Sequence, residues 1–161
     1  MLLTPALMDL YADDHPTIAL QKGSQVGGTE WLVTQAIWAA DTGFGGRGNA
    51  FYLMPTQNLV EDLVSTRINP AIDEIPYLKR RTRESSRPAV DRYGLKRIGK
   101  GNLFLRGADS DRQILSVDAD MVLLDEYDKM SPRVLSLAVQ RLGSSQSGRL
   151  RIASTPTAAG V

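Results

Sequence analysis

The sequence contains no cysteine and a single histidine, His15, among its 161 residues. The absence of cysteine excludes disulfide bonds and Cys-based zinc sites, and a lone histidine excludes a His-rich metal centre. A chain without cysteine also suits a reducing compartment. A domain of this length can bury most of its apolar surface, so it needs no covalent or metal support for its core.

Long hydrophobic runs are missing as well. No stretch approaches the roughly 18 apolar residues of a membrane-spanning helix. The first ten residues lack the basic start of a signal peptide, and Pro5 and Asp9 interrupt their apolar character. We therefore expect a soluble, intracellular protein that consists of one domain.

The net charge is only +1, but the charges are unevenly distributed. Nine of the 19 Lys and Arg residues lie between Lys79 and Lys100, together with only two of the 18 Asp and Glu residues. Basic clusters can bind nucleic-acid phosphates without sequence preference. The segment is therefore either a DNA-contacting surface or a solvated charged face. The candidate DNA-contacting residues are Arg80, Arg81, Arg83 and Arg97.

Short apolar runs alternate with helical patterns along the chain. Several of the runs are nearly continuous in apolar character, which is typical of strands covered on both faces of a parallel sheet. The alternation predicts an α/β sandwich. The segment Tyr77–Gly101 fits this pattern less well and is either a β-hairpin or a mobile insertion. The expected strands are Thr17–Gln21, Ala50–Met54, Asn102–Leu105, Asp120–Leu124 and Leu150–Ser154; the expected helices are Thr29–Ala40, Gln57–Ile72 with an interruption at Asn69-Pro70, and Pro132–Leu142.

An unusual phosphate-binding loop follows the first expected strand. The standard P-loop, G-x-x-x-x-G-K-[ST], lies between a strand and a helix. When the final hydroxyl is aligned on Thr29, Gly28 stands in the lysine position and Lys22 in the position of the first glycine. Backbone N–H groups still form an anion site, Thr29 is a candidate Mg²⁺ ligand, and Lys22 could fold back to the phosphates. The candidate nucleotide-binding residues are Lys22, Gly23, Ser24, Gln25, Val26, Gly27, Gly28 and Thr29.

A pair of carboxylates ends the apolar run Met121–Leu124. The carboxyl ends of strands are where α/β sheets place ligands. We assign Asp125 to Mg²⁺ binding and Glu126 to general-base activation of water. We expect Asp128 to be a helix cap or a salt-bridge partner. A phosphate loop followed by such a pair is what Mg²⁺-dependent ATP hydrolysis requires.

Four stretches together resemble the large terminase subunit of tailed bacteriophages, in particular its lambda-like branch. This subunit is the motor that pumps DNA into capsids. The lysine-first loop and the ending Ser154-Thr155-Pro156-Thr157 are the most specific parts of the resemblance. The four stretches are Thr4–Asp9, Lys22–Glu30, Gly101–Asp128 and Ser154–Thr157.

The resemblance implies a P-loop NTPase of the additional-strand, RecA-like class. Such a fold is a three-layer sandwich with a mainly parallel central sheet, in which the strand ending at Ser154 lies between those of the phosphate loop and the acidic pair. The implied cofactors are ATP and Mg²⁺. Lys22 and Glu126 take catalytic roles, and the stretch Ser154, Thr155, Pro156 and Thr157 matches the motif that couples hydrolysis to DNA movement.

The resemblance also implies partners. They are double-stranded DNA, the portal protein and the small terminase subunit, with subunits arranged as a ring on the procapsid in the cytoplasm of an infected bacterium. A neighbouring subunit could donate an arginine, and no motif selects among Arg133, Arg141 and Arg149. The family's C-terminal nuclease is absent from residues 1–161, so we expect ATPase but no nuclease activity.

Two other functions are compatible with the motifs. One is a helicase-like nucleic-acid translocase, because Asp-Glu-x-Asp also occurs in helicases, which need a second ATPase-like lobe. The other is a catalytically silent module that binds only DNA or a partner subunit. Nucleotide binding distinguishes the silent module from both enzymes.

Overall fold

The computed structural model describes residues 5–23, 26–44, 46–83, 91–92, 94–143 and 145–156. These residues form a seven-stranded sheet with the order β1-β7-β6-β2-β5-β4-β3. The first five strands in this order are parallel, and β4 and β3 extend one edge in antiparallel fashion. The strands are β1 (Thr17–Gln21), β2 (Asn49–Met54), β3 (Asp91–Arg92), β4 (Leu95–Ile98), β5 (Gly101–Gly107), β6 (Met121–Asp125) and β7 (Arg149–Ser154).

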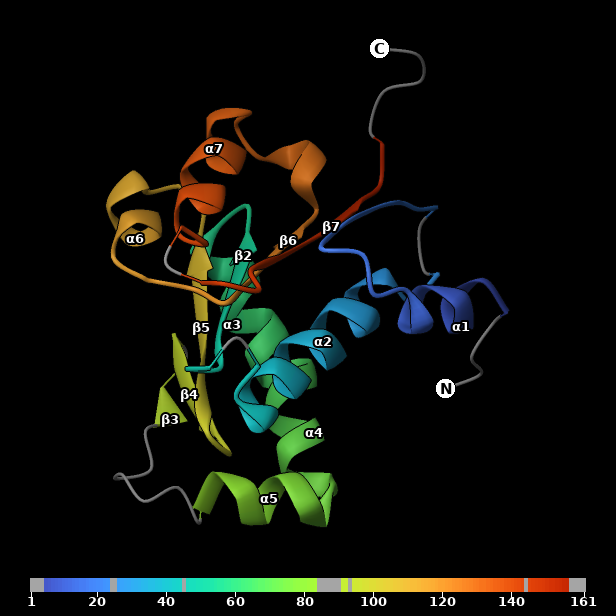
Figure 1. Cartoon of the computed structure of the whole chain (residues 1–161), viewed down its shortest axis with the longest axis vertical. Helices are drawn as coiled ribbons and strands as arrows, with labels where there is room; N and C mark the ends of the chain where they lie inside the picture. The colour runs from blue at the N-terminus through green and yellow to red at the C-terminus, as the bar shows by residue number, and fades with distance from the viewer. Residues whose placement is uncertain are drawn as a thin grey trace.

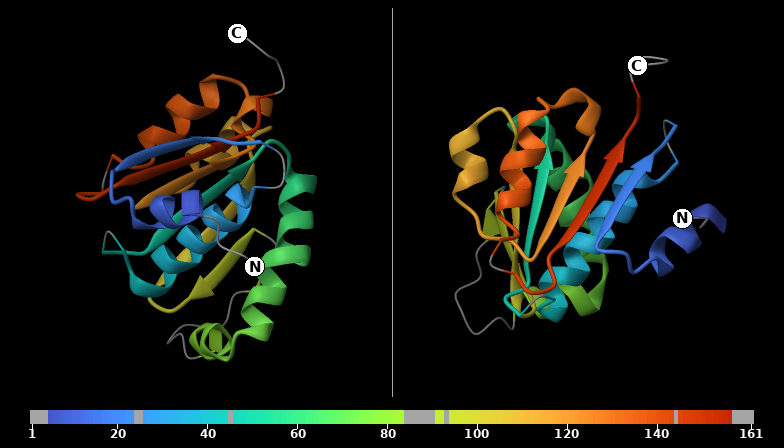
Figure 2. Two further views of the ribbon diagram at one scale, coloured as in Figure 1. Left: turned by 90° about the vertical axis from the view of Figure 1, so that its right-hand side faces the viewer. Right: turned by 45° about the horizontal axis from the view of Figure 1, so that its top comes forward.

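Helices cover both faces of this sheet (Figures 1 and 2). One core lies between the sheet and α2 with α3, and the second lies between the sheet and α6 with α7. The predicted three-layer α/β sandwich is therefore confirmed. The helices are α1 (Pro5–Ala12), α2 (Gly28–Thr42), α3 (Gln57–Leu63), α4 (Asn69–Glu74), α5 (Pro76–Arg83), α6 (Asp111–Leu115) and α7 (Arg133–Gln140).

The central strands β2 and β6 explain the continuous apolar runs of the sequence. All five residues of β6 are buried, as are five of the six in β2. Strands covered by helices on both faces have no solvent side, so alternation disappears. β5 lies one strand nearer the antiparallel edge, and its residues alternate between buried and half-buried.

Strand β7 lies between β1 and β6, as the family resemblance implies. Its register aligns Gln21 with Ser154 and Ala153 with Asp125. All three strands are parallel, so their carboxyl ends meet at one edge of the sheet. The phosphate loop, the acidic pair and the Ser154 segment, which are far apart in sequence, therefore come together there.

The expected interruption of the helix Gln57–Ile72 needs correction. Helical structure continues through Asn69-Pro70 to Glu74, and a π-helical turn at Val64–Ile68 ends two residues before the proline. Proline lacks an N–H and its ring clashes with the preceding turn, and a π turn is one way to absorb that defect.

Among the described residues, no helix is both long enough and apolar enough to cross a membrane.

The segment Tyr77–Gly101 begins as a helix, which neither of our alternatives predicted. Residues Pro76–Arg83 form α5, whose Arg81 donates from Nε to Asp41 Oδ1 at 2.6 Å. The second half matches the hairpin alternative, since β3 pairs antiparallel with β4, and β4 with β5. The charged composition of α5 is explained by its position at the outer edge of the molecule (Figure 1).

The middle of β7 carries a buried charge. Arg151 is 1% exposed, and its Nη1 donates to the carbonyl of Pro16 at 3.1 Å. Its Nε and Nη2 have no hydrogen-bond partner among the residues described. Burial lowers the pKa of Arg151 to about 10, so keeping this group charged at neutral pH costs the folded protein free energy.

We therefore expect Arg151→Met to stabilise the fold. Replacing a buried, only partly compensated charge with an apolar side chain of similar length raises the free energy of unfolding, here by about 1 kcal/mol at neutral pH. Urea denaturation measures the change. Arg149→Met is the matched control, because Arg149 pairs with Asp14 at 2.7 Å and should yield no gain. A loss of stability in Arg151→Met would contradict the expectation.

Candidate active site

The phosphate loop connects β1 to α2 at the carboxyl edge of the sheet. Gly27 precedes the helix in the left-handed region, at φ 84° and ψ 13°, a conformation that glycine adopts without strain. No side chain caps the helix at this position, so its first N–H groups are available to an anion. Two predicted nucleotide-binding residues, Ser24 and Gln25, lie outside the described part of the chain.

The side chain of Lys22 folds back across the loop to Gly28. A Cβ atom at Gly28 would clash with Lys22 Cδ and lie 2.8 Å from Cε. The stem of Lys22 therefore occupies the space in which a side chain at position 28 would begin. In the standard loop that side chain is the lysine. The missing side chain of Gly28 is what makes room for Lys22.

Asp125 is fully buried at the end of β6, although it carries a carboxylate. Its Oδ2 accepts a hydrogen bond from the Tyr52 hydroxyl at 2.8 Å, and its Oδ1 accepts from the Glu126 N–H at 3.0 Å. Burial raises the pKa of Asp125, while hydrogen bonds from Tyr52 and Thr29 and the charge of Lys22 oppose the rise. The loop lysine, the loop hydroxyl and the strand-end carboxylate thus form one cluster.

The backbone of Glu126 is unusual. It is the only non-glycine residue with positive φ among those described, at φ 53° and ψ 43°. Such a conformation costs free energy and is held only when the surroundings impose it. Its Oε2 lies 2.6 Å from Lys129 Nζ, in the 3₁₀ turn Tyr127–Lys129. A hydrogen bond to Glu126 raises the pKa of Lys129.

Asp128 differs from our expectation, because its hydrogen bonds go to Ser154 rather than to a helix end or a basic side chain. Its Oδ1 accepts from Ser154 Oγ at 2.8 Å, and its N–H donates to the same Oγ at 3.0 Å. The carbonyl of Ser154 also accepts from the Lys22 N–H at 2.9 Å. Ser154 therefore connects the phosphate loop to the turn after the acidic pair. Thr157 lies outside the described residues.

The oxygens present suit Mg²⁺. This ion is commonly held by one or two carboxylates and keeps several waters and substrate phosphates as ligands. Asp125 and the hydroxyl of Thr29 offer a carboxylate and a neutral oxygen in mutual contact. No cluster of three or more His, Cys, Asp or Glu residues that could hold a metal occurs in the described ranges, so any ion here would depend on water and phosphate for its other ligands.

Comparison with known proteins decides the family. The sequence model of one protein family, the phage terminase large subunit gpA ATPase domain, matches residues 4–161. The chain belongs to this family. No curated protein matches it significantly.

Solved structures of terminases have the same fold. The large terminase ATPase domain of Thermus phage P74-26 is 20% identical with a TM-score of 0.61, over 99% of this chain and 72% of that one. The large terminase of a thermophilic bacteriophage in complex with ADP is 18% identical with a TM-score of 0.65, over 91% of this chain and 35% of that one. The same terminase in complex with ATP-gamma-S gives 21% identity and a TM-score of 0.61, over 91% and 34%. This terminase ATPase domain thus spans about a third of that thermophilic phage protein.

The candidate DNA-contacting residues of this terminase domain lie in different environments. Arg80 is exposed on α5, 5.9 Å from the Tyr77 ring, whereas Arg81 is held by Asp41. Arg97 is half-buried on β4. The side chain of Arg83 lies outside the described part. Arg80 is therefore the most accessible of the three described candidates.

The three arginines considered for donation to a neighbouring terminase subunit all have partners within the chain. Arg133 lies 3.0 Å from Asp111, and Arg141 donates to the carbonyl of Leu115 at 3.0 Å. Arg149 pairs with Asp14 and lies 4.8 Å from the Phe44 ring. None of these contacts selects one of the three.

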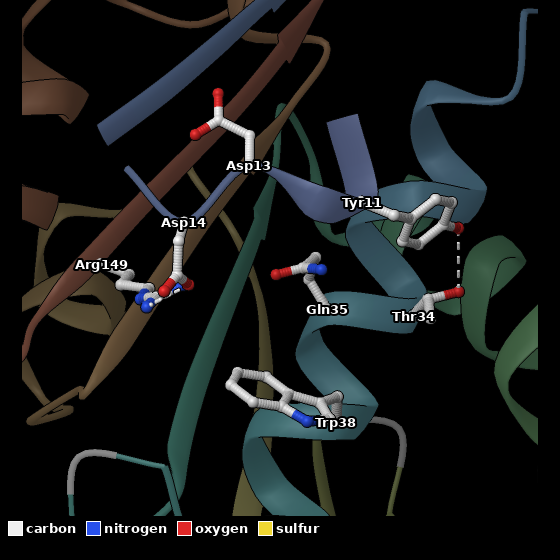
Figure 3. Close-up of a pocket in the computed structure, with 7 residues that line it drawn as sticks. All are labelled: Tyr11, Asp13, Asp14, Thr34, Gln35, Trp38 and Arg149. Atoms are coloured by element: carbon white, nitrogen blue, oxygen red, sulfur yellow. Dashed lines mark hydrogen bonds and ion pairs between the residues drawn. The ribbon is translucent and has the colours of Figure 1, made fainter. Parts of the chain in front are cut away.

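A pocket of about 350 Å³ lies away from the phosphate loop, between α2 and the residues that precede β1 (Figure 3). Asp14 and Arg149 face one another on one side, and the Tyr11 hydroxyl contacts Thr34 on the other. Trp38 lies farther along α2. No residue of the loop or the acidic pair lines it, so this pocket is not the nucleotide site.

The sequence did not reveal two residues that contact the acidic pair, Tyr52 beside Asp125 and Lys129 beside Glu126. Tyr52 was counted only as part of an apolar strand, although a buried phenol needs a hydrogen-bond partner and thus signals a polar neighbour. Burial, followed by the charge of Asp125, raises the pKa of Tyr52 well above its ordinary value, so the hydroxyl keeps its proton. Lys129 stands three residues after Glu126 but had no assigned role.

The raised pKa of Asp125 predicts that Asp125→Asn stabilises the nucleotide-free domain. A carboxyl group whose pKa is higher in the folded than in the unfolded protein destabilises the fold when it is ionised. This destabilisation is complete above the folded pKa, decreases as the pH falls through that pKa, and is absent below the unfolded pKa. We expect the melting temperature at pH 7 to rise by about 2–4 °C and the gain to vanish in acid. Differential scanning fluorimetry in EDTA tests this, with exposed Asp118→Asn as the control. A lower melting temperature in Asp125→Asn would contradict the account.

Proposed function

We propose that this terminase ATPase domain hydrolyses ATP with Mg²⁺ and uses the energy to drive double-stranded DNA into a procapsid. The observation that carries the proposal is the stem of Lys22 over Gly28, because it lays the lysine side chain across the standard lysine position of a P-loop, with its charge acting on Asp125. The family and the nucleotide complexes of the structural neighbours support it.

The residues divide the chemistry between the loop and the strand end. The N–H groups of the loop and of α2 bind the phosphates, and Lys22 neutralises charge that builds up on the β- and γ-phosphates. Thr29 and Asp125 would hold Mg²⁺, which would supply further positive charge to the phosphates. Glu126 accepts a proton from the attacking water.

Ser154 is suited to couple hydrolysis to movement. It contacts the loop through its carbonyl and Asp128 through its hydroxyl. A shift of the loop after loss of the γ-phosphate would therefore reach both the end of β7 and the 3₁₀ turn. The following residues, Thr155, Pro156 and Thr157, continue from this junction and would pass the shift to the DNA-moving parts of the motor.

The partners follow from the same proposal. DNA phosphates would contact Arg80, with Arg83 and Arg97 as further candidates, while Arg81 acts mainly in holding α5 to α2. The portal protein, the small terminase subunit and neighbouring copies in a ring would engage the full-length subunit in the cytoplasm of the infected host. A salt titration of duplex DNA binding with Arg80→Ala measures the contact between Arg80 and the DNA phosphates.

The position of Lys22 yields a three-variant test of ATP turnover. Lys22→Ala removes the ammonium, and Gly28→Ala adds a methyl group where the Lys22 stem lies, so both should lower kcat roughly a hundredfold. The double variant Lys22→Gly/Gly28→Lys restores the standard loop and should recover most activity. Steady-state ATPase assays compare the three.

If Lys22→Ala kept full activity, the assigned role of Lys22 would be wrong. If the unaltered domain failed to bind a labelled ATP analogue at millimolar concentration, the catalytically silent module would be favoured instead.

The base role of Glu126 is tested by comparing the two members of its ion pair. Glu126→Gln removes the proton acceptor and should lower hydrolysis about 10²–10⁴-fold without weakening ATP binding. Lys129→Met breaks the same ion pair but leaves the carboxylate, so hydrolysis should persist. Equal losses in both variants would show that the ion pair, rather than the base, matters.

A further inference from the structure

The Tyr52 hydroxyl is the one side-chain donor to Asp125 that comes from a neighbouring strand of the sheet, among the contacts described. Tyr52 stands opposite Leu123 in the parallel register of β2 and β6, two residues before Asp125. Both Tyr52 and Leu123 face the core beneath α2. Alternation along β6 places Asp125 on that same face, so the long phenol side chain reaches diagonally to it.

The contact leaves the carboxylate little freedom. Tyr52 holds Oδ2 at 2.8 Å, and the Glu126 N–H holds Oδ1 at 3.0 Å. Tyr52 is fully buried, so its hydroxyl is shielded from solvent where it donates to Asp125. An ionised carboxylate has about four acceptor positions, so these two donors and the Thr29 hydroxyl still leave room for a metal ion or its water. The plane of the carboxylate is thus fixed from behind while its remaining lone pairs stay available.

We infer that Tyr52 is a positioning residue that orients the Asp125 carboxylate toward Mg²⁺ in the nucleotide site. The inference rests on the proposed function, because it needs Asp125 to serve the metal. Hydrogen-bonding partners behind metal ligands commonly change metal affinity about 10–100-fold when removed. Tyr52 is expected to act on the metal step and not on the binding of phosphates by the loop.

The test is Tyr52→Phe in the whole chain, which removes one oxygen and keeps the ring that fills the core. Binding of a fluorescent ATP analogue is titrated at increasing MgCl₂ and, separately, in EDTA. We expect the Mg²⁺ concentration for half-maximal enhancement of binding to rise roughly tenfold, while the affinity in EDTA stays within about twofold of the unaltered protein.

Tyr77→Phe is the matched control. Tyr77 donates to Asp41 Oδ2 at 2.7 Å, so the variant loses a Tyr–Asp hydrogen bond of nearly the same length. Asp41 lies near the end of α2 that is remote from the loop. This control should leave the Mg²⁺ dependence unchanged. In an Asp125→Asn background, Tyr52→Phe should have no further effect.

The outcomes separate the two claims. An unchanged Mg²⁺ dependence in Tyr52→Phe would overturn the inference and leave the proposed function standing. Loss of binding in both MgCl₂ and EDTA would assign Tyr52 a purely structural role and overturn it as well. Absence of any Mg²⁺ effect in the unaltered protein would refute the proposed use of Asp125, and the inference would fall with it.

Discussion

The structure depends on one unfavourable burial, that of the Asp125 carboxylate at the end of a wholly apolar strand. A buried charge is tolerated only when donors and opposite charges surround it. Here the donors come from three separate parts of the chain: Tyr52 on β2, Thr29 at the start of α2 and the backbone of Glu126. Lys22 contributes the opposing charge. These groups thus gather around the carboxylate in the chain without any ligand.

Much of this arrangement was predictable from the sequence, because its signals are local or follow from sheet geometry. Continuous apolar runs marked all five parallel strands, and β1 was predicted with its observed bounds. Parallel strands place their carboxyl ends at one edge, so Lys22, Asp125 and Ser154 could be expected to meet. The strand order itself came from family resemblance, since apolar runs do not specify which strand lies beside which.

The remainder depended on contacts between distant residues, which no local pattern reveals. The helix α5 is strongly charged, and Asp41 from α2 holds its Arg81. Asp128 was expected to cap a helix or form a salt bridge, but its partner is a hydroxyl 26 positions away. Tyr52 has no polar neighbour in sequence, so only the register of β2 against β6 could reveal its partner.

The space above Gly28 also constrains how such a loop can change over evolution. It admits one long side chain, which can enter from either end of the loop. A lysine gained at position 28 would displace the Lys22 stem yet supply its own ammonium, after which Lys22 would be free to drift. Losing Lys22 first would leave no ammonium at all. A stepwise change between the two loop forms therefore keeps a lysine in this space at every step only if it passes through a loop that carries both lysines.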